Sequence, residues 1–391
     1  MRMGARLRAT PPWFVWLLTA VMLCHTSINL VRPMVSYRAL ELGVAPQYLG
    51  MVAACYAIVP VLVALPVGRV ADRRGGLVFA VVGSALLTIA SAGLGASDTV
   101  GALLSLFVFL GVGHLLAMIA LQGLVARHSA PEEFDRRFGY FTFASALGQL
   151  LGPAIAGGVT GGFGQASITA ALAAGAVVAG LALPCALLIR APGPVATPRP
   201  DNAEEPPPSL VQILRAPGVA RAMLASLLVL SAVDILIIYM PALGDERGLA
   251  TSTVAWLLTL RAAASMVSRL FLGLLVDRFG RSTLLGAGML ISAVAWAQLA
   301  IATQVWTIAL AMVILGATLG LAQPLSMAWV ATQSPANAVS TALSMRLMGN
   351  RCGQVTVPAL VGAVSSAGGV TAVCIVTGVT LASSVLVVRS R

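Results

Sequence analysis

Twelve apolar runs of membrane-spanning length divide this chain of 391 residues, and most of its charged residues fall between the runs. Only 9% of the residues are charged, whereas a soluble domain carries about 25%. A hydrocarbon layer of roughly 30 Å is crossed by about 20 helical residues, and a helix satisfies its own backbone hydrogen bonds in lipid. The sequence therefore predicts an all-α membrane protein whose twelve transmembrane helices cover approximately residues 13–33, 47–67, 77–97, 100–126, 138–160, 166–189, 218–243, 252–275, 283–302, 305–330, 338–361 and 366–388.

A short loop motif, G-x-x-x-D-R-x-G, occurs twice between these runs. The two copies are separated by 205 residues (273 − 68) and consist of Gly68, Asp72, Arg73 and Gly75, then Gly273, Asp277, Arg278 and Gly280. The same offset carries Asn29 onto Asp234, and it carries Gly148, Gln149 and Pro153 onto Gly353, Gln354 and Pro358. One offset through three separate elements predicts two pseudo-symmetric six-helix bundles, which is the architecture of alternating-access transporters.

A polar, proline-rich stretch lies between the sixth and seventh runs. Its prolines exclude a regular helix over most of its length. We therefore predict a first bundle at residues 1–190, a cytoplasmic linker at 191–217 and a second bundle at 218–391. The end of the linker, Ser209 to Arg215, has the pattern of one amphipathic surface turn.

The basic residues indicate how the chain crosses the membrane. All 24 are arginines, and most lie in the two tails and in alternate loops, so the positive-inside rule places both termini in the cytoplasm. The basic N-terminus could pass for a signal peptide, but its apolar run is long enough to span and lacks a clear small-residue cleavage site, so we interpret it as the first helix. We expect a multi-pass protein of a bacterial cytoplasmic (inner) membrane.

The sequence contains none of the patterns that would indicate an enzyme or a cofactor protein. It has no G-x-x-x-x-G-K-[ST] loop and no nucleophile elbow, and its five cysteines lie within apolar runs without metal-type spacing. We therefore expect no enzyme activity, no cofactor and no metal. The net charge of +11 follows the membrane topology, so it does not indicate a nucleic-acid partner. The energy for transport then comes from an ion gradient or from the substrate's own gradient.

Over nearly its whole length the chain resembles the major facilitator superfamily. The resemblance rests on the twelve runs, the repeat, the central linker and the loop motif, which that family writes G-x-L-x-D-R-x-G-R-[RK]. The first copy here has Gly76 and Leu77 in place of the basic tail, whereas the second copy keeps Arg281. The resemblance implies that Asp72 and Arg73 latch the cytoplasmic side closed in an outward-facing state. The alternative is a solvated turn that merely follows the positive-inside rule.

The fifth predicted helix carries a glycine-proline pattern. It resembles the antiporter motif G-x8-G-x3-G-P-x-x-G-G in Gly139, Gly148, Gly152 and Pro153, while the final pair, Gly157-Gly158, is one position late. The resemblance implies export, and small residues here allow close helix crossing and bending. The alternative is a glycine-rich packing helix. The fourth predicted helix departs from the antiporters, because Ile119 stands where they carry an arginine, although His114 precedes it.

Asp234 is the only carboxylate well inside a predicted span. Because an ionisable group in lipid is costly, it is a functional-site hypothesis by default. It can bind a proton, pair with an arginine or contact a cationic substrate. The alternative is a structural ion pair with Arg261 or Arg351.

Other polar residues within the spans share helix faces. His25, Asn29 and Arg32 follow at i, i+4 and i+7, which places them on one stripe. Arg32 could instead snorkel to the interface or pair with Glu41. Because guanidinium groups match carboxylate and phosphate, the deep arginines tilt the predicted substrate toward an anion or zwitterion. The predicted proton and substrate pathway consists of Asp234, His25, Asn29, Arg32, His114, Gln149, Arg261, Arg346 and Asn350.

The sequence thus predicts a monomeric, proton-linked exporter of a small organic molecule, embedded in the lipid bilayer. A proton symporter that imports a small organic anion is the second hypothesis. A third, a non-transporting sensor or scaffold on the same fold, has little support because no appended domain or long tail is visible in the chain.

Overall fold

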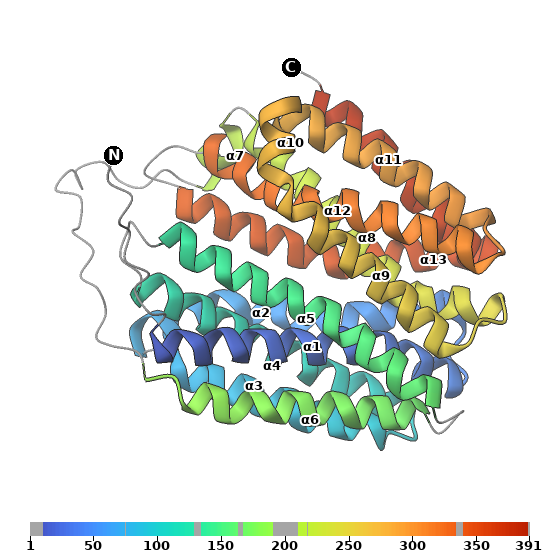
Figure 1. The fold of residues 1–391 in the computed structure, drawn as a ribbon, viewed down its shortest axis with the longest axis horizontal. Helices are drawn as coiled ribbons and strands as arrows, with labels where there is room; N and C mark the ends of the chain where they lie inside the picture. Colours follow the sequence, from blue (N-terminus) through green and yellow to red (C-terminus); the bar gives the residue numbers. More distant parts are fainter. Residues whose placement is uncertain are drawn as a thin grey trace.

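The structure is a computed structural model that describes residues 11–74, 76–128, 134–162, 167–190, 210–216, 218–333 and 339–389. In these residues the regular structure is helical throughout, and the long helices lie side by side in two groups (Figure 1). The first group contains α1 (Pro12–Glu41), α2 (Leu49–Arg74), α3 (Leu77–Gly95), α4 (Val100–His128), α5 (Phe134–Gly162) and α6 (Ser167–Leu187), with the 3₁₀ turn η1 (Pro46–Tyr48) before α2.

The second group follows the linker. It contains α7 (Leu210–Arg215), α8 (Val219–Glu246), α9 (Thr251–Leu270), α10 (Leu272–Phe279), α11 (Arg281–Ile301), α12 (Val305–Gln333) and α13 (Val339–Arg389). The predicted surface turn at the end of the linker is the short helix α7. The predicted eighth span is bent by 60° between α9 and α10. The last two predicted spans form α13, whose backbone leaves helical geometry at Gly368 and Gly369.

The helix bounds repeat with the offset found in the sequence. Helices α4 and α12 begin 205 residues apart (305 − 100) and end 205 residues apart (333 − 128), and α5 and α13 begin at the same separation (339 − 134). Small-residue contacts repeat as well. A side chain at Gly111 would collide with the backbone of Tyr56, and one at Gly316 would collide with the backbone of Arg261. Glycines at equivalent positions therefore allow α2 to approach α4, and α9 to approach α12, within van der Waals contact of the backbones.

Ten helices in the described residues are long and apolar enough to cross a membrane, or eleven if α9 and α10 count as one bent span. The predicted span at 338–361 is the first part of α13; it is helical but is not among these ten. The all-α membrane fold is therefore confirmed.

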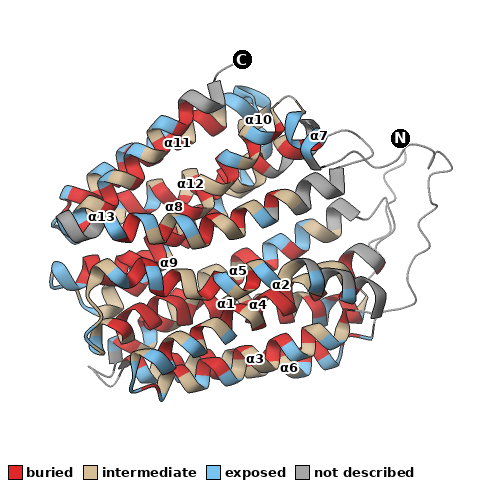
Figure 2. Cartoon of the chain, turned by 180° about the vertical axis from the view of Figure 1, so that it is seen from behind, coloured by how far each residue is buried: buried red, intermediate tan, exposed pale blue. Residues whose placement is uncertain are grey.

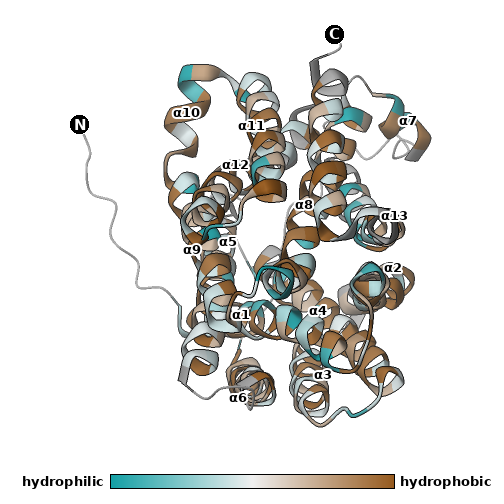
Figure 3. Cartoon of the chain, turned by 90° about the vertical axis from the view of Figure 1, so that its right-hand side faces the viewer, coloured by the Kyte–Doolittle hydropathy of each residue, from teal (hydrophilic) through white to brown (hydrophobic). Residues whose placement is uncertain are grey.

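Burial separates the inward from the outward helix faces. Buried residues follow the inner faces of both groups (Figure 2), whereas large apolar side chains such as Leu62, Ile89, Leu274 and Val379 remain exposed. The end-on view shows hydrophobic colour over much of the outside of the helices (Figure 3). An apolar exterior of this extent suits contact with lipid.

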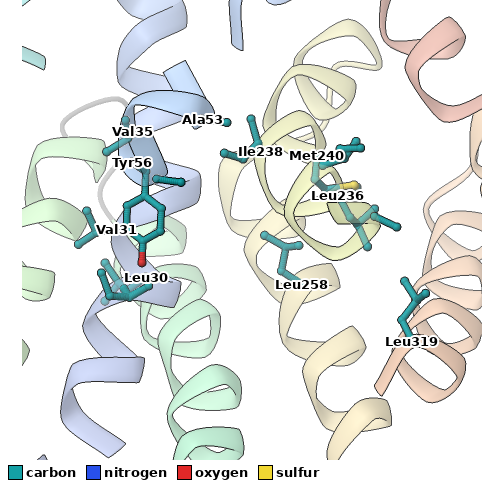
Figure 4. Packing of buried hydrophobic residues seen from close by; sticks show 14 of the residues in the cluster. Leu30, Val31, Val35, Ala53, Tyr56, Leu236, Ile238, Met240, Leu258 and Leu319 are labelled. Carbon is teal, nitrogen blue, oxygen red and sulfur yellow. The ribbon is translucent and has the colours of Figure 1, made fainter. Parts of the chain in front are cut away.

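The two groups meet along helix pairs. Helix α2 packs against α13, and α5 packs against α9, with α1 and α8 between them (Figure 3). One apolar cluster runs through both groups (Figure 4): Tyr56 lies beside Leu30, Val31 and Val35, and the second group contributes Leu236, Ile238, Met240, Leu258 and Leu319. This packing brings the polar stripe of α1 and the carboxylate of Asp234 on α8 to the centre of the molecule.

Candidate functional site

A cavity of about 330 Å³ lies between the two groups of helices. It is lined by α1, α2, α4 and α5 from the first group and by α8, α9, α12 and α13 from the second. All nine residues of the predicted pathway line it: His25, Asn29, Arg32, His114, Gln149, Asp234, Arg261, Arg346 and Asn350. The lining reaches from the second turn of α5, at Phe141, to the ion pair of Arg32 with Asp234.

A buried ion pair joins the two groups of helices at the deep end of this cavity. Arg32 of α1 donates from Nη1 to Oδ1 of Asp234 on α8 at 2.7 Å. Arg32 is 8% exposed and Asp234 is 3% exposed. The predicted alternatives are wrong for both residues, because Asp234 pairs with neither Arg261 nor Arg351, and Glu41 pairs with Arg38 instead of Arg32. Removal of one partner from a charge pair this deeply buried strongly destabilises a protein, because the other charge stays buried without a partner.

The second group of helices extends the hydrogen bonding around the carboxylate. Gln354 donates from Nε2 to the other oxygen of Asp234, Oδ2, at 2.6 Å. Arg351 in turn donates from Nη1 to Oε1 of Gln354 at 3.0 Å. Both carboxylate oxygens are thus engaged, one by each group of helices, and a change in the charge of Asp234 would reach α1 and α13 together.

A cluster of rings covers the side of Arg32 that faces the first group. The guanidinium lies over the ring of Tyr56, 4.8 Å from its centroid, and the hydroxyl of Tyr56 is 2.5 Å from Nδ1 of His114. The rings of His114 and His25 meet edge to face at 5.3 Å. Tyr56 therefore connects the ion pair to the two imidazoles of the cavity.

Asn29 shares the cavity but does not contact Asp234. Its Nδ2 donates to the carbonyl oxygen of His25, one turn earlier in the same helix, at 2.8 Å. The two residues that the repeat offset relates therefore line one cavity without a hydrogen bond between them. Arg32, nearly one turn further along α1, takes the carboxylate instead.

Three further arginines of the second group line the cavity. Arg346 donates from Nη2 to the carbonyl oxygen of Gln323 at 3.3 Å and to Oγ of Ser326 at 3.2 Å. Arg269 donates from Nε to the carbonyl oxygen of Gly320 at 3.2 Å. Arg261 is 5% exposed, and it makes no hydrogen bond or ion pair with any residue that the structure describes. Only Arg32 among the cavity arginines therefore has an anionic partner in the described chain.

The glycines of the predicted helix-five motif have unequal surroundings. A β-carbon at Gly152 would lie 2.6 Å from the carbonyl oxygen of Thr26, and one at Gly148 would lie 2.7 Å from Cβ of His25. Nothing lies within 4 Å of such an atom at Gly139 or Gly158. Gly148 and Gly152 therefore set the close crossing of α5 and α1, next to Pro153 inside α5.

The two copies of the loop motif differ in what the structure describes. Gly75 lies outside the described residues, and so do the side chains of Asp72 and Arg73 and the exposure of Gly68, so the predicted latch stays a prediction. The second copy lies on α10 and just after it, with Gly273, Asp277, Arg278, Gly280 and Arg281 exposed. Gly280 has φ 76° between α10 and α11, a backbone conformation that favours glycine.

The two groups of helices touch closely at the end where α1 finishes and α2 begins. A side chain at Gly50 would collide with the carbonyl of Pro358 on α13, and the backbone N–H of Gly50 donates to the hydroxyl of Tyr239 on α8 at 3.0 Å. On the other flank, Trp256 of α9 packs against Gly157 of α5. These contacts hold α2 against α8 and α13, and α5 against α9, at this end of the molecule.

The sequence-based prediction missed several lining residues. Tyr56, Arg269 and Gln323 were not among the predicted pathway residues, yet all three line the cavity. One signal was available for Tyr56, because it is separated from Arg261 by the repeat offset (261 − 56 = 205). Nothing comparable marks Gln323, an uncharged residue in an apolar helix.

Comparison with known proteins places this architecture in a family. Residues 17–255 and 222–390 match the model described as Major Facilitator Superfamily, and the two matches together cover nearly the whole chain. The chain belongs to the Major Facilitator Superfamily. As a superfamily member with ten or eleven candidate spans in its described residues, it is a multi-pass membrane protein.

Two curated superfamily relatives match parts of the chain. Efflux pump azaK of Aspergillus niger is 26% identical over 178 residues, which are 44% of this chain and 37% of the pump. Multidrug resistance protein 1 of Bacillus subtilis is 26% identical over 141 residues, 36% of each protein. This chain therefore spans little more than a third of the length of the curated relatives it matches.

Solved transporter structures share the fold across 97% of this chain, each at 15% identity. The nucleoside transporter NupG superposes with a TM-score of 0.77 over 100% of its length. A bacterial homolog of the human lysosomal transporter Spinster, in an inward-facing and unoccupied conformation, gives 0.75 over 95%. A POT family transporter in complex with a thioalcohol-conjugated peptide gives 0.76 over 96%. At this identity the likeness concerns the fold alone.

Proposed function

We propose that this superfamily member is a proton-coupled exporter of a small organic molecule that works by alternating access between its two bundles. The observation that carries the proposal is the Arg32–Asp234 pair, because it joins the two bundles at the deep end of the central cavity. A bond between bundles that rock against each other must break or re-form during the cycle. Its one carboxylate is the group through which a proton can control that step.

The proposed orientation is an inward-facing one in a bacterial cytoplasmic membrane. The basic loops place both termini in the cytoplasm, and the cavity then lies on the cytoplasmic side of the Arg32–Asp234 pair. In this orientation the contacts around Gly50 and Trp256 hold the two bundles together on the external side. We assign residues 1–190 and 218–391 to the two bundles and 191–217 to the cytoplasmic linker, and we propose that a monomer is sufficient for transport.

The coupling step begins at Asp234. A proton on its carboxyl group removes the charge that holds Arg32, so the contact between α1 and α8 weakens while Gln354 keeps a partner. Tyr56, His114 and His25 then provide a line of polar groups between Arg32 and the rest of the cavity. Because a proton and a substrate favour different states of the bundles, their binding can drive exchange.

Uptake is the second candidate. The excess of arginines around the cavity favours a proton symporter that imports a small organic anion. Two features support export instead: the spacing of Gly139, Gly148, Gly152 and Pro153 in α5, and the names of the two partial relatives, an efflux pump and a multidrug resistance protein.

The deciding experiment is metabolite profiling of cells and medium with overexpressed wild type, Asp234→Asn and the matched control Asp245→Asn, all at equal membrane levels. Asp245 lies on the same helix but is exposed. We expect one or more compounds to be enriched in the medium with wild type and with Asp245→Asn, but not with Asp234→Asn. Enrichment inside the cell would support uptake. The profiling is repeated after the cells have been challenged with toxic compounds. If no compound is enriched in either direction in both experiments, the transport proposal is contradicted.

A further inference from the structure

The central cavity carries a surplus of positive charge. Among its lining residues are five arginines and a single carboxylate, that of Asp234; the arginines are Arg32, Arg261, Arg269, Arg346 and Arg351. Arg32 neutralises the carboxylate. The other four guanidinium groups therefore face the cavity without an anion from the described chain. Surplus charge away from water is costly unless something balances it.

Neutral oxygens hold three of these four arginines. Arg346 has Gln323 and Ser326, Arg269 has the carbonyl of Gly320, and Arg351 has the side chain of Gln354. Arg261 is the exception, since it is buried and lacks any partner in the described chain. Its charged neighbours are Arg269, Asp234 and Arg32, and Asp234 is already engaged at both oxygens.

The backbone that carries Arg261 is fixed in place. Gly316 of α12 lies so close to the carbonyl group of Arg261 that a side chain at Gly316 would collide with it. Ser265 lies one turn further along α9, and a β-carbon at Gly320 of α12 would lie 2.8 Å from its Cα. Arg261 thus projects from a rigid helix crossing, which is how a protein holds a binding group in position before the ligand arrives.

We propose that Arg261 binds an anionic group, a carboxylate or a phosphate, of the transported substrate. The inference rests on the proposed transport function and names the substrate class. A guanidinium presents parallel N–H groups that match two oxygens of a carboxylate or phosphate. The N–H groups of Arg261 are not engaged by the described chain and are available for such a group. The remaining arginines add a favourable electrostatic field for an anion inside the same 330 Å³ cavity.

The experiment has a binding arm and a transport arm. The binding arm measures the thermal stability of purified full-length protein in nanodiscs with inorganic phosphate or acetate, against chloride at equal ionic strength. We expect phosphate or acetate to stabilise wild type and the control Arg215→Gln, whose site is exposed on α7. Arg261→Gln should bind the anion about tenfold more weakly or worse, the scale expected for a lost charge-assisted hydrogen bond.

Arg261→Lys guards against a variant that fails to fold, because it keeps the charge and loses only the two-pronged geometry. We expect it to bind phosphate more weakly than wild type and more tightly than Arg261→Gln. Equal stabilisation of wild type and Arg261→Gln, or no stabilisation of wild type by either anion, would overturn the proposal.

The transport arm identifies the charge of the compounds that wild type moves in the profiling experiment. A carboxylate or phosphate on these compounds, and its loss from the profile with Arg261→Gln, is the expected result. Neutral or cationic compounds would overturn the substrate class while leaving transport intact, and Arg261 would then hold an inorganic counter-ion. Failure to find any compound would refute transport itself, and the binding arm would still decide whether Arg261 holds an anion.

Discussion

The Arg32–Asp234 pair makes a quantitative prediction. Its atoms are 2.7 Å apart, so at an effective dielectric constant of about 20 the attraction is about 6 kcal/mol (332/(20 × 2.7)). Desolvation of both groups offsets much of this, but removal of one partner leaves a buried charge alone. We therefore expect Arg32→Met or Asp234→Leu alone to lower the free energy of unfolding by about 3–5 kcal/mol.

The double variant should lose less than either single variant. Without both charges the site is apolar, and the remaining penalty is the unpaired amide of Gln354, about 1–3 kcal/mol. The measurement is a double-mutant cycle on purified protein in mixed micelles, with unfolding by increasing SDS followed by tryptophan fluorescence. The exposed pair of Arg38 with Asp98, at 3.4 Å, is the control, and its coupling should stay below about 1 kcal/mol. Additive losses for Arg32 and Asp234 would refute the reasoning.

Three further variants test the packing. Gly50→Val should overpack the contact with α13, at a cost of about 1–3 kcal/mol, and loosen that end of the molecule. Cysteines placed there should become more reactive, and unchanged reactivity would contradict the contact with α13. Gly152→Leu should abolish the crossing of α5 and α1 and sharply reduce the yield of folded protein, whereas Gly158→Leu, in open space, should be folded normally. Arg247→Gln should destabilise the protein by about 1.5–3 kcal/mol, because its Nη2 donates to two carbonyls at the end of α11; unchanged stability would argue against this.

Hydropathy predicted where the chain crosses the membrane better than where its helices end. The first span was predicted to end at residue 33, where Arg32 and Pro33 interrupt the apolar run, yet α1 continues to Glu41. The backbone stays helical through Arg32 and Pro33, and Asp234 balances the charge of Arg32 inside the fold. A hydropathy pattern marks the bilayer, whereas a helix ends where its backbone hydrogen bonds end.

The contents of the cavity could be predicted, but the pairing within it could not. Polar side chains in an apolar span are costly in lipid and therefore turn toward the interior. This is why all nine predicted residues line the cavity. Which arginine meets Asp234 depends on the tilt and register of α1 against α8, which come from contacts far apart in the sequence. For the same reason the sequence could not predict that Tyr56 covers Arg32. Nor could it predict that Arg261, which the repeat offset relates to Tyr56, stays unpaired in the described chain.

The surplus of arginines has an electrical consequence. A charge that crosses the whole membrane field gains or loses about 2.3 kcal/mol per 100 mV. If the bundles rock around the cavity, the four guanidinium groups without an anion shift within that field even when nothing is bound. The membrane voltage would then set how fast the empty carrier returns. A bound anion would cancel part of this charge, so the loaded and the empty protein would respond to the same voltage differently.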